Sequence, residues 1–162
     1  MEALLSLSDR VVAPSVGEYL DPKSEKFKEW FADSKVCLRA GRPMTLFRGI
    51  TRTLEARHPS AALGVFLTPD KAVASAYAGN AGKLLGFYVC IKRPFITDMS
   101  VLQDISTLNE ASALKAKLIR SGYDGIFARH KDSDQPPSYV SEYIAFHLNQ
   151  LRPFQETQAR IG

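Results

Sequence analysis

Glu142 and Arg48 are each the only charge in an otherwise apolar row of a predicted strand. Alternate residues of a strand point to the same face. The row of Glu142 lies in the predicted strand 139–148 and also holds Val140, Ile144 and Phe146. The row of Arg48 lies in the predicted strand 44–50 and also holds Leu46 and Ile50. A charge in such a row is costly unless it is paired or solvated, so each of the two needs a reason.

Three explanations account for these two charges. The side chains of Arg48 and Glu142 pair with each other across the core, or they lie at wet strand ends, or they face a ligand in a cleft. The third explanation is a chemical one. A fixed carboxylate stabilises positive charge that develops at the anomeric carbon of a sugar, and a guanidinium binds the oxygens around it.

The elements that would position these residues are short helices placed among about five strands. Apolar periodicity predicts strands at 44–50, 63–68, 83–92, 123–128 and 139–148, and helices at 21–31, 69–78 and 108–121. Helices and strands do not alternate regularly enough for a doubly wound sheet. The pattern therefore favours an α+β domain built on antiparallel or mixed sheets.

Local signals predict where the helices begin. Asp21 is expected to cap the first helix, with Pro22 at its first position. Thr68 can cap the helix that follows the second strand. Thr107 and Glu110 form the sequence signature of a capping box. The helix 108–121 is expected to turn Leu108, Ala111, Leu114 and Leu118 inward. The helix 69–78 places Ala72, Val73, Ala76 and Tyr77 on one face.

Length and composition indicate one globular domain over 1–162, with a lead-in segment at 1–20 and a flexible tail at 155–162. Two cysteines are too few for a disulfide framework and fit a reducing cytoplasm. The three histidines show no metal-ligand spacing, so no metal is expected. The formal charge of +4 permits a nucleic-acid partner without arguing for one. No apolar stretch is long enough to span a membrane.

Five motifs resemble, in order, those of ADP-ribosyltransferase domains, in particular the small domains encoded by phages and mobile elements. They are FKEWFADSK at 27–35, GRPMTLFRGI at 41–50, GVFLTPDKAVASAYAG at 64–79, SGYDGIFA at 121–128 and SEYIAFHLNQLRPF at 141–154. The resemblance implies an ADP-ribosyltransferase-like fold, in which two small sheets form a cleft for NAD with helices at its flanks. It covers residues 24–154.

The resemblance also implies a role for each matching residue. Glu142 would be the catalytic carboxylate that bonds the 2′-hydroxyl of the nicotinamide ribose, and Arg48 would bind the NAD ribose or phosphates. The backbone of Gly49 would hold the nicotinamide amide. Phe66 and Tyr77 would contact the two faces of the nicotinamide ring, and Thr68 occupies a small-hydroxyl position. Ordinary core packing is the alternative explanation for Phe66 and Tyr77, and helix capping is the alternative for Thr68.

Two positions depart from the motifs of the family. Arg48-Gly49-Ile50 stands where His-Gly-Thr is usual, which resembles the Arg-Ser-Glu branch. That branch carries Glu or Gln two residues before its catalytic Glu, to engage the target side chain, whereas this chain has Val140. An apolar residue cannot orient a guanidinium, so arginine is not favoured as the acceptor.

The implied activity is mono-ADP-ribosyl transfer from NAD to a protein acceptor. The setting that the resemblance implies is the cytoplasm of a bacterial host, where a phage or mobile-element effector with a toxin-like action would modify a host protein. Three alternatives remain open at this stage: a catalytically inactive module of the same fold that binds a protein partner, an NAD glycohydrolase in which water replaces the acceptor, and a transferase with a nucleic-acid acceptor.

Overall fold

The computed structural model describes residues 16–51, 58–130, 136 and 139–154. It contains two small sheets. The first sheet has the order β1 (Thr45–Ile50), β3 (Lys83–Val89), β7 (Leu151–Pro153), with both pairs of neighbours antiparallel. The second has the order β2 (Val65–Leu67), β6 (Glu142–Ala145), β5 (Gly125–Arg129), β4 (Pro94–Asp98). Only β4 and β5 are parallel. The predicted α+β class, with small antiparallel and mixed sheets, is confirmed.

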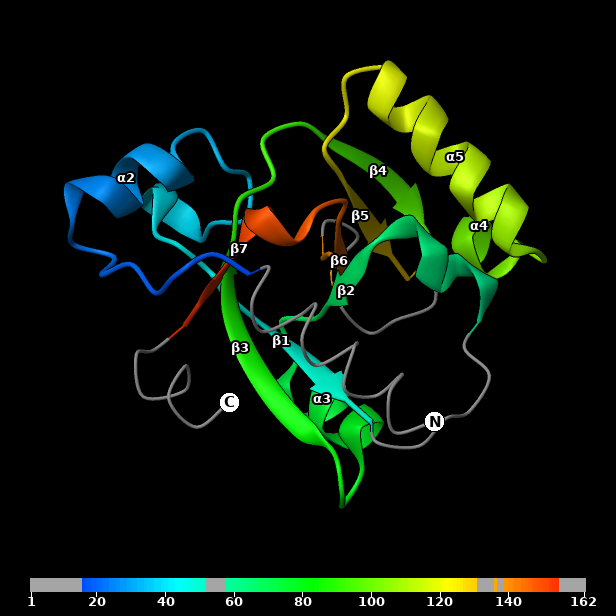
Figure 1. Ribbon diagram of the computed structural model, residues 1–162, viewed down its shortest axis with the longest axis horizontal. Coiled ribbons are helices and arrows are strands. Elements are labelled where there is room, and N and C mark those ends of the chain that lie inside the picture. Colours follow the sequence, from blue (N-terminus) through cyan, green and yellow to red (C-terminus); the bar gives the residue numbers. More distant parts are fainter. Residues whose placement is uncertain (1–15, 52–57, 131–135, 137–138, 155–162) are drawn as a thin grey trace.

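The two sheets join where β1 passes the end of β2. The backbone N–H of Phe47 donates to the carbonyl of Thr68 at 2.8 Å, and the N–H of Thr68 returns a bond to the carbonyl of Phe47 at 2.9 Å. In Figure 1 this junction lies between the long β1–β3 pair and the second sheet. Residues far apart in the sequence are therefore brought together here by main-chain hydrogen bonds.

Four α-helices are described: α2 (Glu25–Phe31), α3 (Lys71–Ala78), α4 (Met99–Gln103) and α5 (Leu108–Arg120). Helix α3 packs against β1, and α5 packs against the short 3-10 helix Pro59–Leu63. Figure 1 shows α4 and α5 beside the second sheet, with α2 at the opposite end of the molecule. Two further 3-10 turns lie at Arg39–Gly41 and Leu148–Gln150.

Two apolar clusters hold these layers together. The first joins both sheets and includes Leu46, Leu67, Phe87 and Tyr143. The second lies under α5 and includes Leu118, Ile126, Ile144 and Phe146. The strand β6 contributes to both clusters because its successive side chains point to opposite faces.

Several helix starts differ from the predictions. Helix α2 begins later than predicted, because Ser24 and not Asp21 accepts the capping bond, from the N–H of Phe27. Asp70 and not Thr68 caps α3, since its carboxylate accepts the N–H groups of Ala72 and Val73. The start of α5 was predicted correctly: the Thr107 side chain accepts the N–H of Glu110 at 3.1 Å. The Glu110 carboxylate, however, accepts the N–H of Ser106, one residue before the expected partner.

The predicted helix faces are only partly right. On α5, Ala111 and Leu118 are buried as expected, whereas Leu108 is 63% exposed. On α3 the buried residues are Ala74 and Ala78, and the predicted face is exposed. Helix α3 therefore turns two alanines to the sheet, which allows it to lie close against β1.

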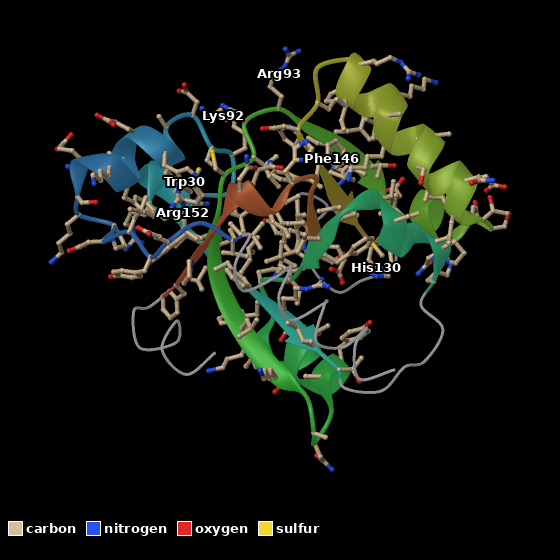
Figure 2. The ribbon with its side chains drawn as sticks, in the orientation of Figure 1. Trp30, Lys92, Arg93, His130, Phe146 and Arg152 are labelled. Carbon is tan, nitrogen blue, oxygen red and sulfur yellow. The ribbon has the colours of Figure 1, made fainter. Side chains whose placement is uncertain are left out.

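The described part of the lead-in segment is attached to β7. The N–H of Gly17 donates to the carbonyl of Leu151 at 3.2 Å, and Arg152 Nη1 donates to the carbonyl of Glu18 at 3.1 Å. The Arg152 guanidinium also lies 5.4 Å from the centre of the Trp30 ring, and Figure 2 shows these two side chains side by side. The rest of the lead-in and the predicted tail at 155–162 lie outside the described residues.

Candidate active site

A pocket of about 300 Å³ opens at the junction of the two sheets. All six residues to which the sequence assigned a role line it: Arg48, Gly49, Phe66, Thr68, Tyr77 and Glu142. Its described lining is completed by Phe47, His58, Ser60, Ala61, Gly64, Val73 and Ala74. The structure therefore brings the predicted site residues together in one cavity.

Four elements supply these side chains. Strand β1 carries Arg48, and β2 carries Phe66. Glu142 is the first residue of β6, which pairs with β2 so that Leu67 lies opposite Tyr143. Continuing this antiparallel register by one residue places Thr68 opposite Glu142. The fourth element, α3, brings Tyr77 to the same pocket.

Arg48 ties the two sheets together at the pocket wall. Its side chain is half-buried, and its Nη1 donates to the carbonyl of Phe66 at 3.1 Å. The guanidinium therefore links β1 to β2 while it also lines the cavity.

Glu142 is half-buried at the pocket, and burial raises the pKa of its carboxyl group from 4.5 to about 7, although the nearby Arg48 guanidinium acts to lower it. Among the described residues, no ion pair joins Arg48 to Glu142. Direct pairing across the core is therefore not the explanation for these two charges. Glu142 lies at a strand end, as the second explanation required, but that end faces the pocket.

The two aromatic residues differ in their surroundings. Phe66 is half-buried and packs against the second core cluster while lining the pocket, so both explanations given for it hold. Tyr77 is 60% exposed, which excludes core packing as the reason for an aromatic residue at this position. Its exposed ring, with Val73 at 50% exposure on the same helix, forms an apolar side of the pocket.

Thr68 and Gly49 have structural reasons for their residue types. The Thr68 hydroxyl accepts the N–H of Asp70 at 3.1 Å, so it stabilises the turn into α3 without capping the helix. A Cβ on Gly49 would lie 2.0 Å from the carbonyl oxygen of Ala74. Glycine is therefore required here for the close approach of α3 to β1, which also forms one wall of the pocket.

His58 and Ser60 were missed by the sequence analysis, which considered His58 only as a metal ligand. Both line the pocket. The Nδ1 atom of His58 lies 2.9 Å from the Ser60 hydroxyl and accepts the backbone N–H of Ser60 at 3.2 Å. The sequence did contain a signal, because His-Pro-Ser places proline at the first helical position after a capping residue.

Val140 precedes β6 and packs against the first core cluster. It is not among the described residues that line the pocket, and Glu142 is the only carboxylate among them. The described residues include no group of three or more His, Cys, Asp or Glu that could hold a metal ion. None of the described helices is both long and apolar enough to cross a membrane.

These residues give the pocket a carboxylate, a guanidinium and the aromatic rings of Phe47, Phe66 and Tyr77 in about 300 Å³. Such a set can bind a flat aromatic group and stabilise positive charge beside it. Comparison of the chain with models of known protein families and with curated proteins finds no match.

Proposed function

We propose that this protein is an NAD-dependent mono-ADP-ribosyltransferase with an ADP-ribosyltransferase-like fold, and that Glu142 is its catalytic carboxylate. One observation carries the proposal. Six residues from separate parts of the sequence, each assigned a role from the motifs alone, line one pocket at the junction of two sheets. Most of them are polar or partly exposed, so the need for a core does not explain why they gather.

The reaction begins when the bond between nicotinamide and ribose breaks. The electron pair of that bond goes to the ring nitrogen, so neutral nicotinamide leaves and a ribosyl cation remains. The ionised Glu142 carboxylate stabilises this cation, and it does so strongly because it is partly withdrawn from water. Phe66 and Tyr77 hold the flat leaving group, and Arg48 binds ribose or phosphate oxygens.

A nucleophilic atom of the acceptor then gives an electron pair to the cationic anomeric carbon, and the proton that it carried is released to water, which completes the transfer. We propose a protein acceptor in the cytoplasm of a bacterial host, with the enzyme acting as a phage or mobile-element effector. Val140 packs into the core where a related branch holds the residue that engages a target arginine. A guanidinium acceptor is therefore disfavoured.

An NAD glycohydrolase is the second candidate, and the same position favours it. If no side chain beside Glu142 orients an acceptor, water can take the acceptor's place and release free ADP-ribose. The inactive binding module is less well supported, because its expected feature was a direct ion pair between Arg48 and Glu142, and the described residues do not form one.

Incubation with labelled NAD and a bacterial lysate tests these functions. We expect label on protein with the wild type and none with Glu142→Gln, which keeps the shape of the side chain but cannot carry the charge. Label that is removed by a protease but not by a nuclease would identify a protein acceptor. Free ADP-ribose without labelled macromolecules would contradict the transferase activity and support the glycohydrolase activity. Negligible turnover of NAD by both the wild type and Glu142→Gln would contradict both enzyme activities.

A further inference from the structure

His58 presents one defined hydrogen-bond donor beside the pocket. A backbone N–H can only donate, so Nδ1 of His58 must be the acceptor of its bond from Ser60. In the neutral ring the proton therefore lies on Nε2. Because the Ser60 hydroxyl also lies against Nδ1, at 2.9 Å, both contacts fix the same edge of the ring and leave the Nε2–H edge for another partner.

A rigid part of the fold holds this donor. Ser60 is only 8% exposed, whereas His58 is exposed, so the pair runs from the wall of the pocket to its outer side. The 3-10 helix Pro59–Leu63 that follows His58 packs against α5. A donor fixed in this way loses little conformational entropy when it binds a ligand.

The size of the pocket indicates which part of NAD would meet His58. A volume of about 300 Å³ is at the lower end of the range of about 300–1,000 Å³ for pockets that enclose drug-sized ligands. NAD is larger than such ligands, since it consists of two nucleotides joined by a pyrophosphate. With the nicotinamide riboside half inside, the pyrophosphate must leave the pocket past its exposed lining residues.

We propose that His58 binds a pyrophosphate oxygen of NAD through its Nε2–H, with Ser60 as the positioning residue that fixes the ring. The proposal rests on the proposed function, because it takes NAD as the ligand. The chemistry matches, since pyrophosphate oxygens only accept hydrogen bonds and the available edge of the neutral ring only donates. Hydrogen bonds to charged oxygens are also stronger than those between neutral groups.

Three substitutions of His58 separate its donor from its capping bond. His58→Asn keeps an oxygen that can accept the Ser60 N–H as a helix cap, but its amide is too short to reach the Nε2 position. His58→Gln is long enough to place an N–H near that position. His58→Ala removes both functions. Ser60→Ala removes the hydroxyl but keeps the backbone N–H that fixes the ring.

Calorimetry of the full chain with NAD and with nicotinamide riboside tests the proposal. We expect His58→Asn and His58→Ala to bind NAD about tenfold to a hundredfold more weakly than the wild type, the usual effect of losing a hydrogen bond to a charged group. His58→Gln should stay within about threefold of the wild type, because it keeps a donor. Ser60→Ala, which loses the hydroxyl contact with the ring but keeps the backbone N–H, should bind NAD with an affinity between those of the wild type and His58→Asn. Nicotinamide riboside, which has no phosphate, should bind the wild type and His58→Asn equally.

Three results would overturn the proposal. If His58→Asn binds NAD as tightly as the wild type, His58 makes no such bond, and the proposed function is unaffected. If His58→Asn weakens the binding of nicotinamide riboside as much as the binding of NAD, His58 contacts the nicotinamide riboside half of the ligand and not the pyrophosphate. If the wild type binds neither ligand, the proposed function fails together with this inference.

Discussion

Glu142 is held between two opposing influences, the low polarity of the pocket wall and the positive charge of Arg48. Burial is the stronger of the two, so the carboxyl group remains partly protonated near neutral pH. Stabilisation of a ribosyl cation requires the ionised form. The proposed function therefore requires Glu142 to be ionised, although ionisation of this half-buried group lowers the stability of the folded chain.

The first prediction concerns the pH dependence of NAD cleavage. Nicotinamide release by the wild type should increase with pH, with a midpoint near the Glu142 pKa of about 7. Arg48→Gln should be slower and should also move that midpoint to higher pH, because the guanidinium acts to lower the pKa of Glu142. A midpoint that is the same in both proteins would show that Glu142 is not the titrating group.

The second prediction concerns stability. In the unfolded chain Glu142 ionises near the ordinary pKa of a glutamate, 4.5, whereas in the folded chain its pKa is about 7. The free energy of unfolding therefore falls as pH rises through this window, and the loss is complete above pH 7. At 1.36 kcal/mol for each pKa unit, the cost is about 3 kcal/mol.

Denaturant unfolding of Glu142→Gln tests this cost. The variant should be more stable than the wild type by about 2–3 kcal/mol at pH 8 and equally stable at pH 4, where both states carry the proton. Glu25→Gln, at a side chain that is 83% exposed on α2, is the control and should change stability by less than about 0.5 kcal/mol. A destabilised Glu142→Gln at pH 8 would mean that the carboxylate stabilises the folded chain.

At the scale of elements, the approach of α3 to β1 shapes the pocket. Gly49→Ala would place a methyl group against the carbonyl of Ala74 and push the helix away. We expect a loss of about 1–3 kcal/mol, as for other overpacked sites, together with weaker NAD binding, because Val73, Ala74 and Tyr77 line the pocket from this helix.

Gly41→Ala is the matched control for Gly49→Ala. The backbone φ of Gly41 is +76°, and an added Cβ would meet nothing within 4 Å. Its cost should be about 1–2 kcal/mol, from backbone conformation alone, with unchanged NAD affinity. If Gly41→Ala loses as much stability as Gly49→Ala and also binds NAD more weakly, loss of stability in general, and not the position of α3, reduces NAD binding.

Most strands were predictable from apolar periodicity, but some of their neighbours were not. No strand was predicted between the strand 83–92 and the helix 108–121, whereas β4 begins there at Pro94, at the edge of its sheet, where proline is tolerated. The predicted strand 139–148 is shorter in the structure, where β6 ends at Ala145 and the 3-10 turn Leu148–Gln150 follows. Strand β7 was missed because its three residues are too few to show a period, and it lies in the other sheet. Helix α4 was missed for the same reason of length.

The helix faces could not be predicted from the sequence because periodicity does not show which side meets the sheet. Val73 and Tyr77 are the larger apolar residues of α3, so they were placed together on one face. The helix instead turns two alanines inward, since the close contact with β1 has no space for larger side chains. The exposed Tyr77 is then available to the pocket.

At the scale of the whole molecule, the candidate site exists only because two sheets meet. The residues named from the motifs line one pocket, but the backbone bridge between Phe47 and Thr68 that joins the sheets has no local sequence signal. His58 and Ser60 come to the pocket through the same long-range arrangement. For that reason local sequence patterns indicated Glu142 and Arg48 as site residues but gave no indication that His58 and Ser60 line the same pocket.

The attachment of the lead-in segment gives a whole-molecule prediction. Arg152→Ala removes the contact with the Trp30 ring and the bond to the carbonyl of Glu18. We expect a loss of about 1–2 kcal/mol in thermal or denaturant unfolding and unchanged NAD affinity, because β7 is separated from β1 by β3. Arg152→Lys should be intermediate, since lysine keeps the charge but not the planar stacking. Weakened NAD binding in either variant would connect this edge of the sheet to the pocket.

Nicotinamide release tests the central claim most directly. Purified wild type and Glu142→Gln, shown to be folded by circular dichroism, are incubated with NAD and a bacterial lysate at pH 8, and free nicotinamide is measured by chromatography. We expect steady release by the wild type and release at least about a hundredfold slower by the variant, the usual consequence of losing a group that stabilises transition-state charge. Equal release by the two proteins would contradict the assignment of Glu142 as the catalytic carboxylate.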